Sequence, residues 1–281
     1  MTEKSAVVLL SGGQDSTTCL FWAKMQFDEV HAVAFDYGQR HRSELEAARD
    51  IAELAGARSF EVLELGVLAQ LADSSLVSSS GNISSSGGYQ DAHAEGGLPT
   101  SFVPGRNLLF LGVAGAYAVK LGCHHIIIGV SQADYSGYPD CREEFIEQMA
   151  KTLVAAMPTS ASPITIHAPL MHLSKAEEVL MASELGVECW KALGMSITCY
   201  EGQRPGCGAC PSCQLRQAGF KKAGLEDPAL EFVDDGFEVL DPPSSVPCAR
   251  CLSKRHVETR AEWGHLPTYF CRMCGLSFEE E

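Results

Sequence analysis

Short apolar runs alternate with longer segments of helical spacing along the first two thirds of the chain. The apolar runs, rich in β-branched residues, lie at 6–10, 30–35, 125–130 and 164–169. The segments that repeat apolar side chains every three or four residues lie at 43–54, 107–120, 140–157 and 174–185. Strands that alternate with helices are typical of a parallel sheet covered by helices, so we expect an α/β fold with a doubly wound, mostly parallel sheet.

Two stretches interrupt this pattern. Residues 73–97 are too rich in Ser and Gly to pack, and they are expected to form a mobile loop, either an inert insertion or a lid near a site. Residues 234–247, with the sequence DDGFEVLDPPSSVP, are typical of a linker. The chain therefore predicts a large domain followed by a smaller appendage.

Composition narrows the class of protein. No run of eighteen apolar residues occurs among the 281, and the N-terminus lacks a basic stretch followed by a long apolar one, so we expect a soluble cytoplasmic protein without a membrane partner. A formal charge of −15 disfavours a long nucleic-acid partner. The 12 cysteines, in a chain without a secretory signal, indicate metal binding more than disulfides.

The stretch LSGGQDSTTC at 10–19 directly follows the first apolar run, where a strand should lead into a helix. A glycine-rich turn at this place lets backbone N–H groups and the positive end of the helix dipole converge on an anion, for which phosphate is the natural guest. The stretch has neither the Gly-Lys-Ser/Thr ending of a Walker A loop nor the spacing of a dinucleotide-binding turn. It predicts another kind of phosphate loop, and the alternative is a turn without chemical consequence.

The same stretch resembles the SGGxDS signature of the PP-loop ATP pyrophosphatase superfamily. One family in it, 7-cyano-7-deazaguanine synthase or QueC, has motifs similar to five further stretches: FDYGQRHRSE (35–44), TSFVPGRNLLFL (100–111), GVSQADYSGYPDCREEF (129–145), APLMHLSKAEE (168–178) and ITCYEGQRPGCGACPSCQLRQAGF (197–220). The resemblance runs from about Val7 to Phe220. It implies a PP-loop, adenine nucleotide alpha hydrolase-like fold and a ligase that activates 7-carboxy-7-deazaguanine with ATP, aminates it with ammonia and dehydrates the amide to a nitrile.

Activation of a carboxylate as an acyl-adenylate releases pyrophosphate. We expect the loop from Ser11 to Ser16 to hold that pyrophosphate, with Mg2+ neutralising its charge. The Asp15 carboxylate would repel phosphate, so it is expected to orient the loop or the metal shell. The expected nucleotide contacts are Leu10, Ser11, Gly12, Gly13, Gln14, Asp15, Ser16, Thr17, Thr18, Cys19, Leu20 and Arg40.

Cations within the motifs are candidates for clamping phosphate or the substrate carboxylate. They are Arg40, Arg106, Arg142 and Lys175, and the alternative for each is an ordinary surface residue. The residues expected to act in catalysis are Asp15, Ser16, Arg106 and Lys175.

A purine-like ring needs hydrogen-bond acceptors for its amino and ring N–H groups. Asp134, Tyr135, Ser136 and Asp140 offer such groups in a loop that follows a strand, where ligands of open α/β sheets bind. Arg106, Asn107 and Arg142 complete the expected substrate site. The alternative for Asp140 is a cap for the following helix.

Four cysteines form the clearest spacing signal. They follow the pattern C-x7-C-x2-C-x2-C and are Cys199, Cys207, Cys210 and Cys213. Four thiolates so placed can surround a zinc ion, and the resemblance assigns the same set as a structural zinc site. A redox-active CxxC is the alternative, disfavoured by the two overlapping pairs. The remaining cysteines before residue 199 are expected to be buried apolar residues: Cys19, Cys123, Cys141 and Cys189.

A second set lies beyond the end that is usual for the family. Its spacing is that of a zinc ribbon, and its members are Cys248, Cys251, Cys271 and Cys274. Basic and aromatic residues between them, such as Arg255 and Trp263, favour a docking module for a macromolecule over a tail that only adds stability. One hypothesis is a protein partner whose amine replaces ammonia.

These signals predict a chain in four parts. They are a PP-loop ATP-binding domain at 1–195, a four-cysteine zinc lobe at 196–233, the linker at 234–247 and a zinc ribbon at 248–281. The family resemblance alone implies a homodimer. Besides the nitrile-forming ligase, a ligase that joins 7-amido-7-deazaguanine to a protein, a non-catalytic nucleotide-binding scaffold and a tRNA-modifying thiolase stay as alternatives.

Overall fold

The computed structural model describes residues 4–39, 42–71, 74, 101–132, 138–157, 163–230 and three strands beyond residue 256. The chain separates into two compact units, Met1–Val233 and Asp234–Glu281. Apart from Ser74, the expected loop at 73–97 lies outside the described residues, and so does the expected linker at 234–247. The division into four parts stays a prediction.

The first unit contains five strands and eight α-helices in its described part. The strands are β1 (Ser5–Leu9), β2 (Glu29–Asp36), β3 (Ser59–Glu64), β4 (His125–Ile127) and β5 (Thr165–His167). The helices are α1 (Gln14–Gln26), α2 (Ser43–Leu54), α3 (Val67–Leu71), α4 (Arg106–Leu121), α5 (Glu143–Ala156), α6 (Lys175–Glu184), α7 (Val187–Met195) and α8 (Pro211–Ala223).

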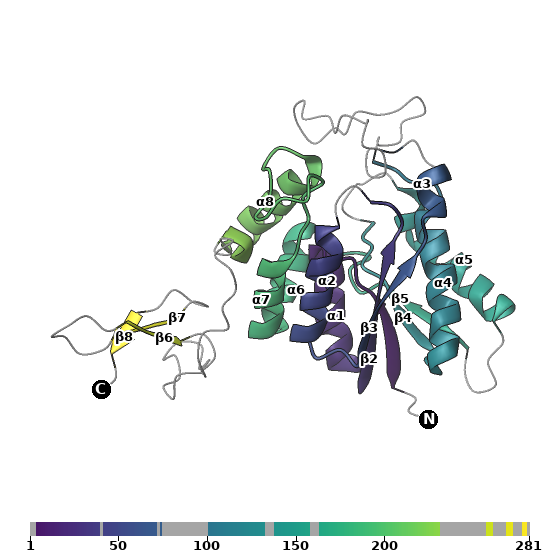
Figure 1. Ribbon diagram of the computed structural model, residues 1–281, viewed down its shortest axis with the longest axis horizontal. Coiled ribbons are helices and arrows are strands. Elements are labelled where there is room, and N and C mark those ends of the chain that lie inside the picture. Colours follow the sequence, from purple (N-terminus) through teal and green to yellow (C-terminus); the bar gives the residue numbers. More distant parts are fainter. Residues whose placement is uncertain are drawn as a thin grey trace. The chain divides into compact units, whose positions relative to one another are not determined.

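The five strands form one parallel sheet in the order β3-β2-β1-β4-β5. Successive residues of β1 point to opposite faces, so Val8 and Val7 belong to two different apolar clusters. Helices α1, α2, α6 and α7 cover one face of the sheet, and α4 and α5 cover the other (Figure 1). The expected doubly wound α/β fold is thereby confirmed.

Three elements differ from the sequence-based expectation in a way that the local chemistry explains, beside shifts of one or two residues at other ends. Strand β3 was not expected, because its sequence SFEVLE carries two glutamates and it lies half-buried at the edge of the sheet. Strand β4 ends at Ile127 instead of 130, where the chain turns past the start of α1. Helix α5 begins at Glu143 instead of Asp140, because Pro139–Cys141 forms a separate 3-10 turn.

The second unit contains an antiparallel sheet in the order β6-β7-β8. Its strands are β6 (Val257–Arg260), β7 (Thr268–Cys271) and β8 (Ser277–Glu279). A small antiparallel sheet is compatible with the expected zinc ribbon, whose ligand set stays a prediction.

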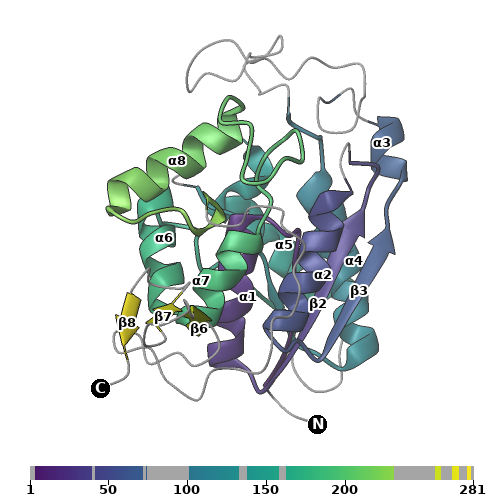
Figure 2. The same ribbon diagram turned by 60° about the vertical axis from the view of Figure 1, so that its left-hand side comes forward.

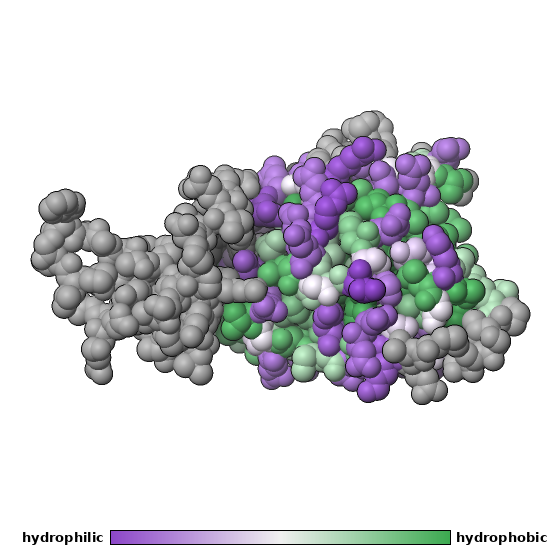
Figure 3. Space-filling model, turned by 60° about the horizontal axis from the view of Figure 1, so that its bottom comes forward, coloured by the Kyte–Doolittle hydropathy of each residue, from purple (hydrophilic) through white to green (hydrophobic). Residues whose placement is uncertain are grey.

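The surface of the first unit is mixed in character. On the face seen in Figure 3, hydrophilic residues (purple) are interspersed with hydrophobic ones (green). In the part of the chain that the structure describes, every helix is too short or too polar to cross a bilayer.

Candidate active site at the carboxyl ends of the strands

The order in which the chain adds strands to the sheet reverses at the central strand, β1. The chain passes from β1 to β2 on one side and later returns to β4 on the other. Ligands of open α/β sheets bind where the strand order reverses in this way. A cavity of about 330 Å3 lies there, lined by residues that follow β1, β2 and β4 and by the first turns of α1, α2, α4 and α6.

The loop between β1 and α1 is held together by its own hydroxyl groups. The backbone N–H of Ser11 donates to Ser16 Oγ at 3.1 Å, and that of Gly13 donates to Ser11 Oγ at 3.3 Å. The Ser16 hydroxyl donates in turn to the Gly13 carbonyl at 3.1 Å. Ser16 therefore fixes the shape of the loop.

Gly12 allows the loop to lie against two other segments. Its φ is +84°, a conformation that favours glycine, and a Cβ there would lie 2.3 Å from the carbonyl oxygen of Glu44 in α2. Its own carbonyl accepts a hydrogen bond from the N–H of Ile197 at 2.9 Å. The loop is thus joined both to α2 and to the segment that leads into the four cysteines.

The expected nucleotide contacts divide into two groups. Those that line the cavity are Leu10, Ser11, Gly13, Gln14, Asp15 and Ser16. Those that do not line it are Gly12, Thr17, Thr18, Cys19 and Leu20. The last four of these are fully buried on the inner side of α1, where the Thr17 and Thr18 hydroxyls bond to carbonyls of the preceding turn.

Gln14 begins helix α1 and is 2 % exposed. Within the described part of the chain, neither its side-chain oxygen nor its nitrogen finds a hydrogen-bond partner. A buried amide without partners costs about 1–3 kcal/mol per unsatisfied group, so such a group lining a cavity indicates a ligand that completes its bonds.

Lys175 joins the loop to the first turn of α6. Its Nζ lies 2.7 Å from Asp15 Oδ1 and 2.6 Å from Glu178 Oε2. Lys175 is 8 % exposed and Glu178 is fully buried, so Lys175 is no ordinary surface residue. The pair of carboxylates holds this cation at the cavity wall, beside the start of α1.

Arg106 lies at the start of α4 among aromatic residues. Its guanidinium lies 6.0 Å from the centre of the Tyr138 ring and bonds to the Tyr37 hydroxyl. Burial lowers the pKa of Arg106, but Tyr37 and Tyr138 outweigh that effect and the net pKa is raised, so Arg106 stays a cation. Phe110 stacks on Phe35 with ring centres 4.5 Å apart and completes this aromatic wall.

Asn107 and Asp140, two expected substrate contacts, are bonded to each other. Asp140 Oδ2 accepts from the backbone N–H of Asn107 at 3.1 Å, and the Asn107 side chain donates to the Asp140 carbonyl. Asp140 therefore caps the preceding helix, α4, and not the following helix as the alternative had it. Arg142 is exposed and does not line the cavity.

The four cysteines expected to be apolar are buried, as predicted. Cys141 is the one that lines the cavity, 3.4 Å from the Asn107 side-chain nitrogen. Burial raises its pKa to about 12, so it is a neutral thiol at physiological pH and no ready nucleophile.

Glu44 lines the cavity, although the residue-by-residue prediction did not include it. Burial raises its pKa to about 7, against the opposing effect of the positive charge of Arg106. Two other lining residues, Tyr37 and Phe110, were missed in the same way, and so was Glu178, which lies behind the lining residue Lys175. All four lie within the quoted motif stretches, which was the available signal.

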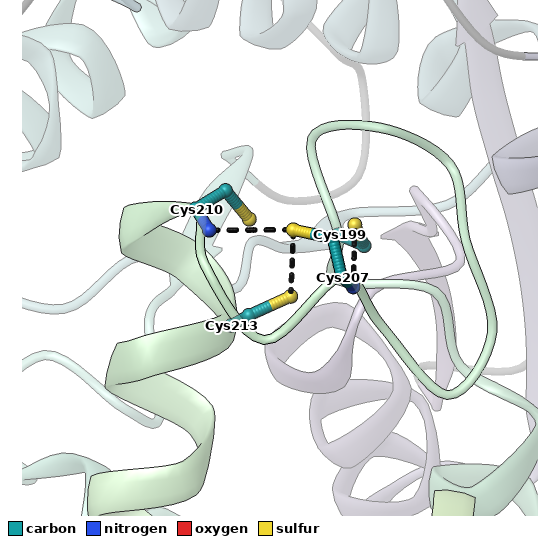
Figure 4. Close-up of side chains that lie close together, drawn as sticks. All are labelled: Cys199, Cys207, Cys210 and Cys213. Atoms are coloured by element: carbon teal, nitrogen blue, oxygen red, sulfur yellow. Dashed lines mark hydrogen bonds between the residues drawn. The ribbon is translucent and has the colours of Figure 1, made fainter. Parts of the chain in front are cut away.

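The cysteines Cys199, Cys207, Cys210 and Cys213 converge as expected. Their sulfur atoms all lie within 4.8 Å of one another (Figure 4). Sulfur atoms around a tetrahedral zinc ion lie about 3.8 Å apart, since each Zn–S bond is about 2.3 Å long, so the group fits a metal ion. Hydrogen bonds from Cys210 and Cys213 lower the pKa of Cys199, which favours the thiolate that a metal needs.

Several expected site residues lie outside the described part of the chain. They are Arg40, Asp134, Tyr135, Ser136, Cys248, Cys251 and Cys274. Cys271 ends strand β7. Their roles stay predictions.

Comparison with known proteins gives a family match over most of the first unit. Residues 5–224 match the family described as "Queuosine biosynthesis protein QueC". A protein of Chromobacterium violaceum named 7-cyano-7-deazaguanine synthase is 48 % identical over 232 residues, which are 82 % of this chain and 94 % of the relative. A protein of the same name from Gloeobacter violaceus is 46 % identical, over 82 % of this chain and 97 % of the relative.

Similarity to solved structures is lower. The U34-tRNA thiolase NcsA from Methanococcus maripaludis matches with a TM-score of 0.39 and 15 % identity, over 65 % of this chain and 56 % of that one. This degree of similarity supports no statement about function.

Proposed function

Because this chain belongs to the QueC family of queuosine biosynthesis proteins, we propose that it is an ATP-dependent ligase that converts 7-carboxy-7-deazaguanine into 7-cyano-7-deazaguanine. The observation that carries the proposal is one cavity in which the SGGQDS loop, Lys175 and Arg106 face the same space. The shared name of the relatives supports this reaction, and it gives no support to the protein-conjugating ligase or the scaffold.

The loop side of the cavity is the proposed nucleotide site. Backbone N–H groups at the start of α1 and the dipole of this helix attract the departing pyrophosphate, and Gln14 offers its amide to the nucleotide. Mg2+, which prefers oxygen ligands, enters with the phosphates, and Asp15 is the loop residue that orients its shell. Lys175 adds a positive charge beside the same phosphates.

The aromatic side of the cavity is the proposed base site. Phe110 and Tyr138 offer faces on which a flat bicyclic ring can stack, and Arg106 supplies a forked cation for the substrate carboxylate. In the family reaction this carboxylate attacks the α-phosphate of ATP and displaces pyrophosphate. Ammonia then displaces AMP to give the amide. A second ATP adenylates the amide oxygen with loss of pyrophosphate, and this oxygen leaves as part of AMP while the nitrogen gives up its two protons, so the nitrile remains.

The four-cysteine group is proposed to hold Zn2+ as a structural ion. A set of four thiolates leaves no open position for substrate, so it stabilises the segment and takes no part in bond making. A second Zn2+ in the terminal unit, and a protein partner that docks there, are proposed from the cysteine spacing alone.

We also propose that the protein is a cytoplasmic homodimer. Support comes from α4, where Leu108 and Val119 are 47 % and 43 % exposed and lie three turns apart on the same face of the helix. A second copy of the chain would cover these side chains. Chromatography with light scattering, at several concentrations and with Leu108→Glu as the test variant, measures whether it does.

The experiment for the reaction is incubation of the purified protein with Mg2+, ATP, ammonium and 7-carboxy-7-deazaguanine, followed by mass spectrometry. AMP, pyrophosphate and the free nitrile are expected. ADP as the main nucleotide product would contradict cleavage at the α-phosphate, and a base adduct on a polypeptide would favour the protein-conjugating alternative.

Two arginines provide a matched test of the base site. Arg106→Met should lower kcat/KM for the deazaguanine by about 100-fold, because a charged hydrogen bond to the carboxylate is lost. Arg142→Met removes an equal charge outside the cavity and should change it less than threefold. An equal loss of kcat/KM in both variants would argue against the proposed base site.

A further inference from the structure

Helices α6 and α8 pack against each other (Figure 2). At this contact, Gly219 of α8 lies against Lys175 of α6. A Cβ added to Gly219 of α8 would lie 2.6 Å from Lys175 Cγ and 3.1 Å from Lys175 Cβ. Gly219 has an ordinary helical conformation, so its backbone does not require glycine. The requirement comes from the aliphatic stem of Lys175, which occupies the space of the missing side chain.

The head of the same lysine is held from the other side. Glu178, one turn further along α6, is fully buried and its Oε2 lies 2.6 Å from Lys175 Nζ. The start of α6 is itself fixed by a reciprocal cap, in which Ser174 and Glu177 bond to each other. Residues outside the phosphate loop therefore locate the stem of Lys175 and, together with Asp15, its head.

Helix α8 is well anchored where it meets Lys175. Two cysteines of the metal group belong to its first turn, Cys210 as its N-cap and Cys213 within it. Further along, buried Arg216 makes a two-pronged bond to Asp227, with distances of 2.6 and 2.7 Å. Because α8 is fixed at these two places, it cannot easily move away from the Lys175 side chain that packs against it.

We propose that Gly219 and Glu178 are positioning residues, which hold Lys175 against Asp15 and so give the four-cysteine segment control over the geometry of the nucleotide site. The inference rests on the proposed function, in which Lys175 faces the phosphates. Helix α8 would then contribute to nucleotide binding through the contact of Gly219 with Lys175, although Gly219 lies outside the phosphate loop.

Gly219→Ala is the test substitution, because one methyl group must displace the Lys175 stem. Gly112→Ala in α4 is the matched control, since it is also a helical glycine and its added Cβ would meet only Met149 Cε, at 4.0 Å. We expect Gly219→Ala to weaken ATP binding, measured by calorimetry, at least tenfold. Gly112→Ala should stay within twofold of the wild type.

A double substitution separates positioning from a general structural effect. A Lys175→Ala background removes Cγ, the atom 2.6 Å from the added methyl group, and leaves only the contacts to Cβ and to the backbone oxygen of residue 175, at 3.1 and 3.2 Å. Adding Gly219→Ala in this background should therefore change the Kd for ATP by less than about threefold. A tenfold loss that persists in this background would overturn the proposal, and so would wild-type affinity in the single Gly219→Ala variant.

Glu178→Gln tests the other contact if the glycine variant does not fold. It keeps the shape of the side chain and removes its charge, and the expected result is again at least a tenfold rise in the Kd for ATP. Unchanged affinity would overturn the proposal. The proposed function is tested separately, because it fails only if the wild-type protein itself produces no AMP from ATP in the presence of the deazaguanine.

Discussion

Substitution of the two glycines of the phosphate loop is expected to have different effects on stability and on nucleotide binding. Gly12 has a φ of +84°, and its added Cβ would lie 2.3 Å from the Glu44 carbonyl oxygen and 3.0 Å from the Ala48 nitrogen. Gly13 has a φ of −84°, and its Cβ would meet nothing closer than Ser11 Oγ at 3.5 Å. Gly12→Ala should therefore damage the fold, whereas Gly13→Ala should damage only the site.

The cost of Gly12→Ala has three parts. A left-handed conformation costs an alanine about 1–2 kcal/mol. Moving the start of α2 away by about 1 Å to relieve the overlap costs about 1–3 kcal/mol, and weakening the bond between Gly12 and Ile197 costs about 1 kcal/mol. The free energy of unfolding should fall by about 3–6 kcal/mol, which lowers the Tm by about 6–24 °C in a domain of this size.

Gly13→Ala has little reason to alter stability. Its methyl group would stand at the cavity wall, beside the backbone N–H groups that are proposed to bind the phosphates, so the KM for ATP should rise about tenfold while the Tm changes by less than about 3 °C. Thermal melts and ATP kinetics on both variants decide the matter. A Gly12→Ala protein that melts with the wild type would refute the reasoning, and so would a Gly13→Ala protein with normal KM.

Three further predictions concern stability. Arg216→Ala should lower the free energy of unfolding by about 3–5 kcal/mol in denaturant titrations, because Asp227 is left buried and unpaired, and Arg216→Lys should not restore it since lysine lacks the fork. Burial, and then the nearby His125, lower the pKa of His167, so the unfolded chain binds a proton more readily than the folded one. Stability should therefore fall as the pH drops below about 6.5, and should fall less in His167→Gln. Removing metal with a chelator at constant pH should lower the Tm of the first unit, and the drop should be smaller in Cys213→Ser protein, which has lost one of the four ligands in that unit.

Much of the first unit could be predicted because its signals are local. Each strand of the sheet interior is an apolar run, and α1 follows a glycine-rich turn, so residues 6–20 show a strand, a loop and a helix without reference to the rest of the chain. The four cysteines are equally local, since three of them lie within seven residues. Thiol spacing of this kind leaves few geometries other than a shared centre.

What the sequence did not show depends on contacts between distant segments. Glu178 has the same helical surroundings in the sequence as Glu177, yet Glu177 is exposed in a cap while Glu178 is buried against the active-site lysine. Edge strand β3 was missed for a related reason, since half-buried strands tolerate the glutamates that hide their pattern. Only the packing of the neighbours distinguishes these cases.

The charge pairs of the cavity also depend on contacts between distant segments. Three cations line it, and from the sequence each could bind an anion. The fold pairs Lys175 with Asp15 and Glu178, and it pairs Arg216 with Asp227, so each of these two cations already has a carboxylate partner. Arg106 differs, because it contacts Tyr37 and Tyr138 and, among the described residues, forms no ion pair with a carboxylate, although the charges of Glu44 and Asp140 act on it from further away. We therefore expect the half-buried Arg106 to attract the carboxylate of the proposed deazaguanine substrate, whose ring would stack on Tyr138 or Phe110.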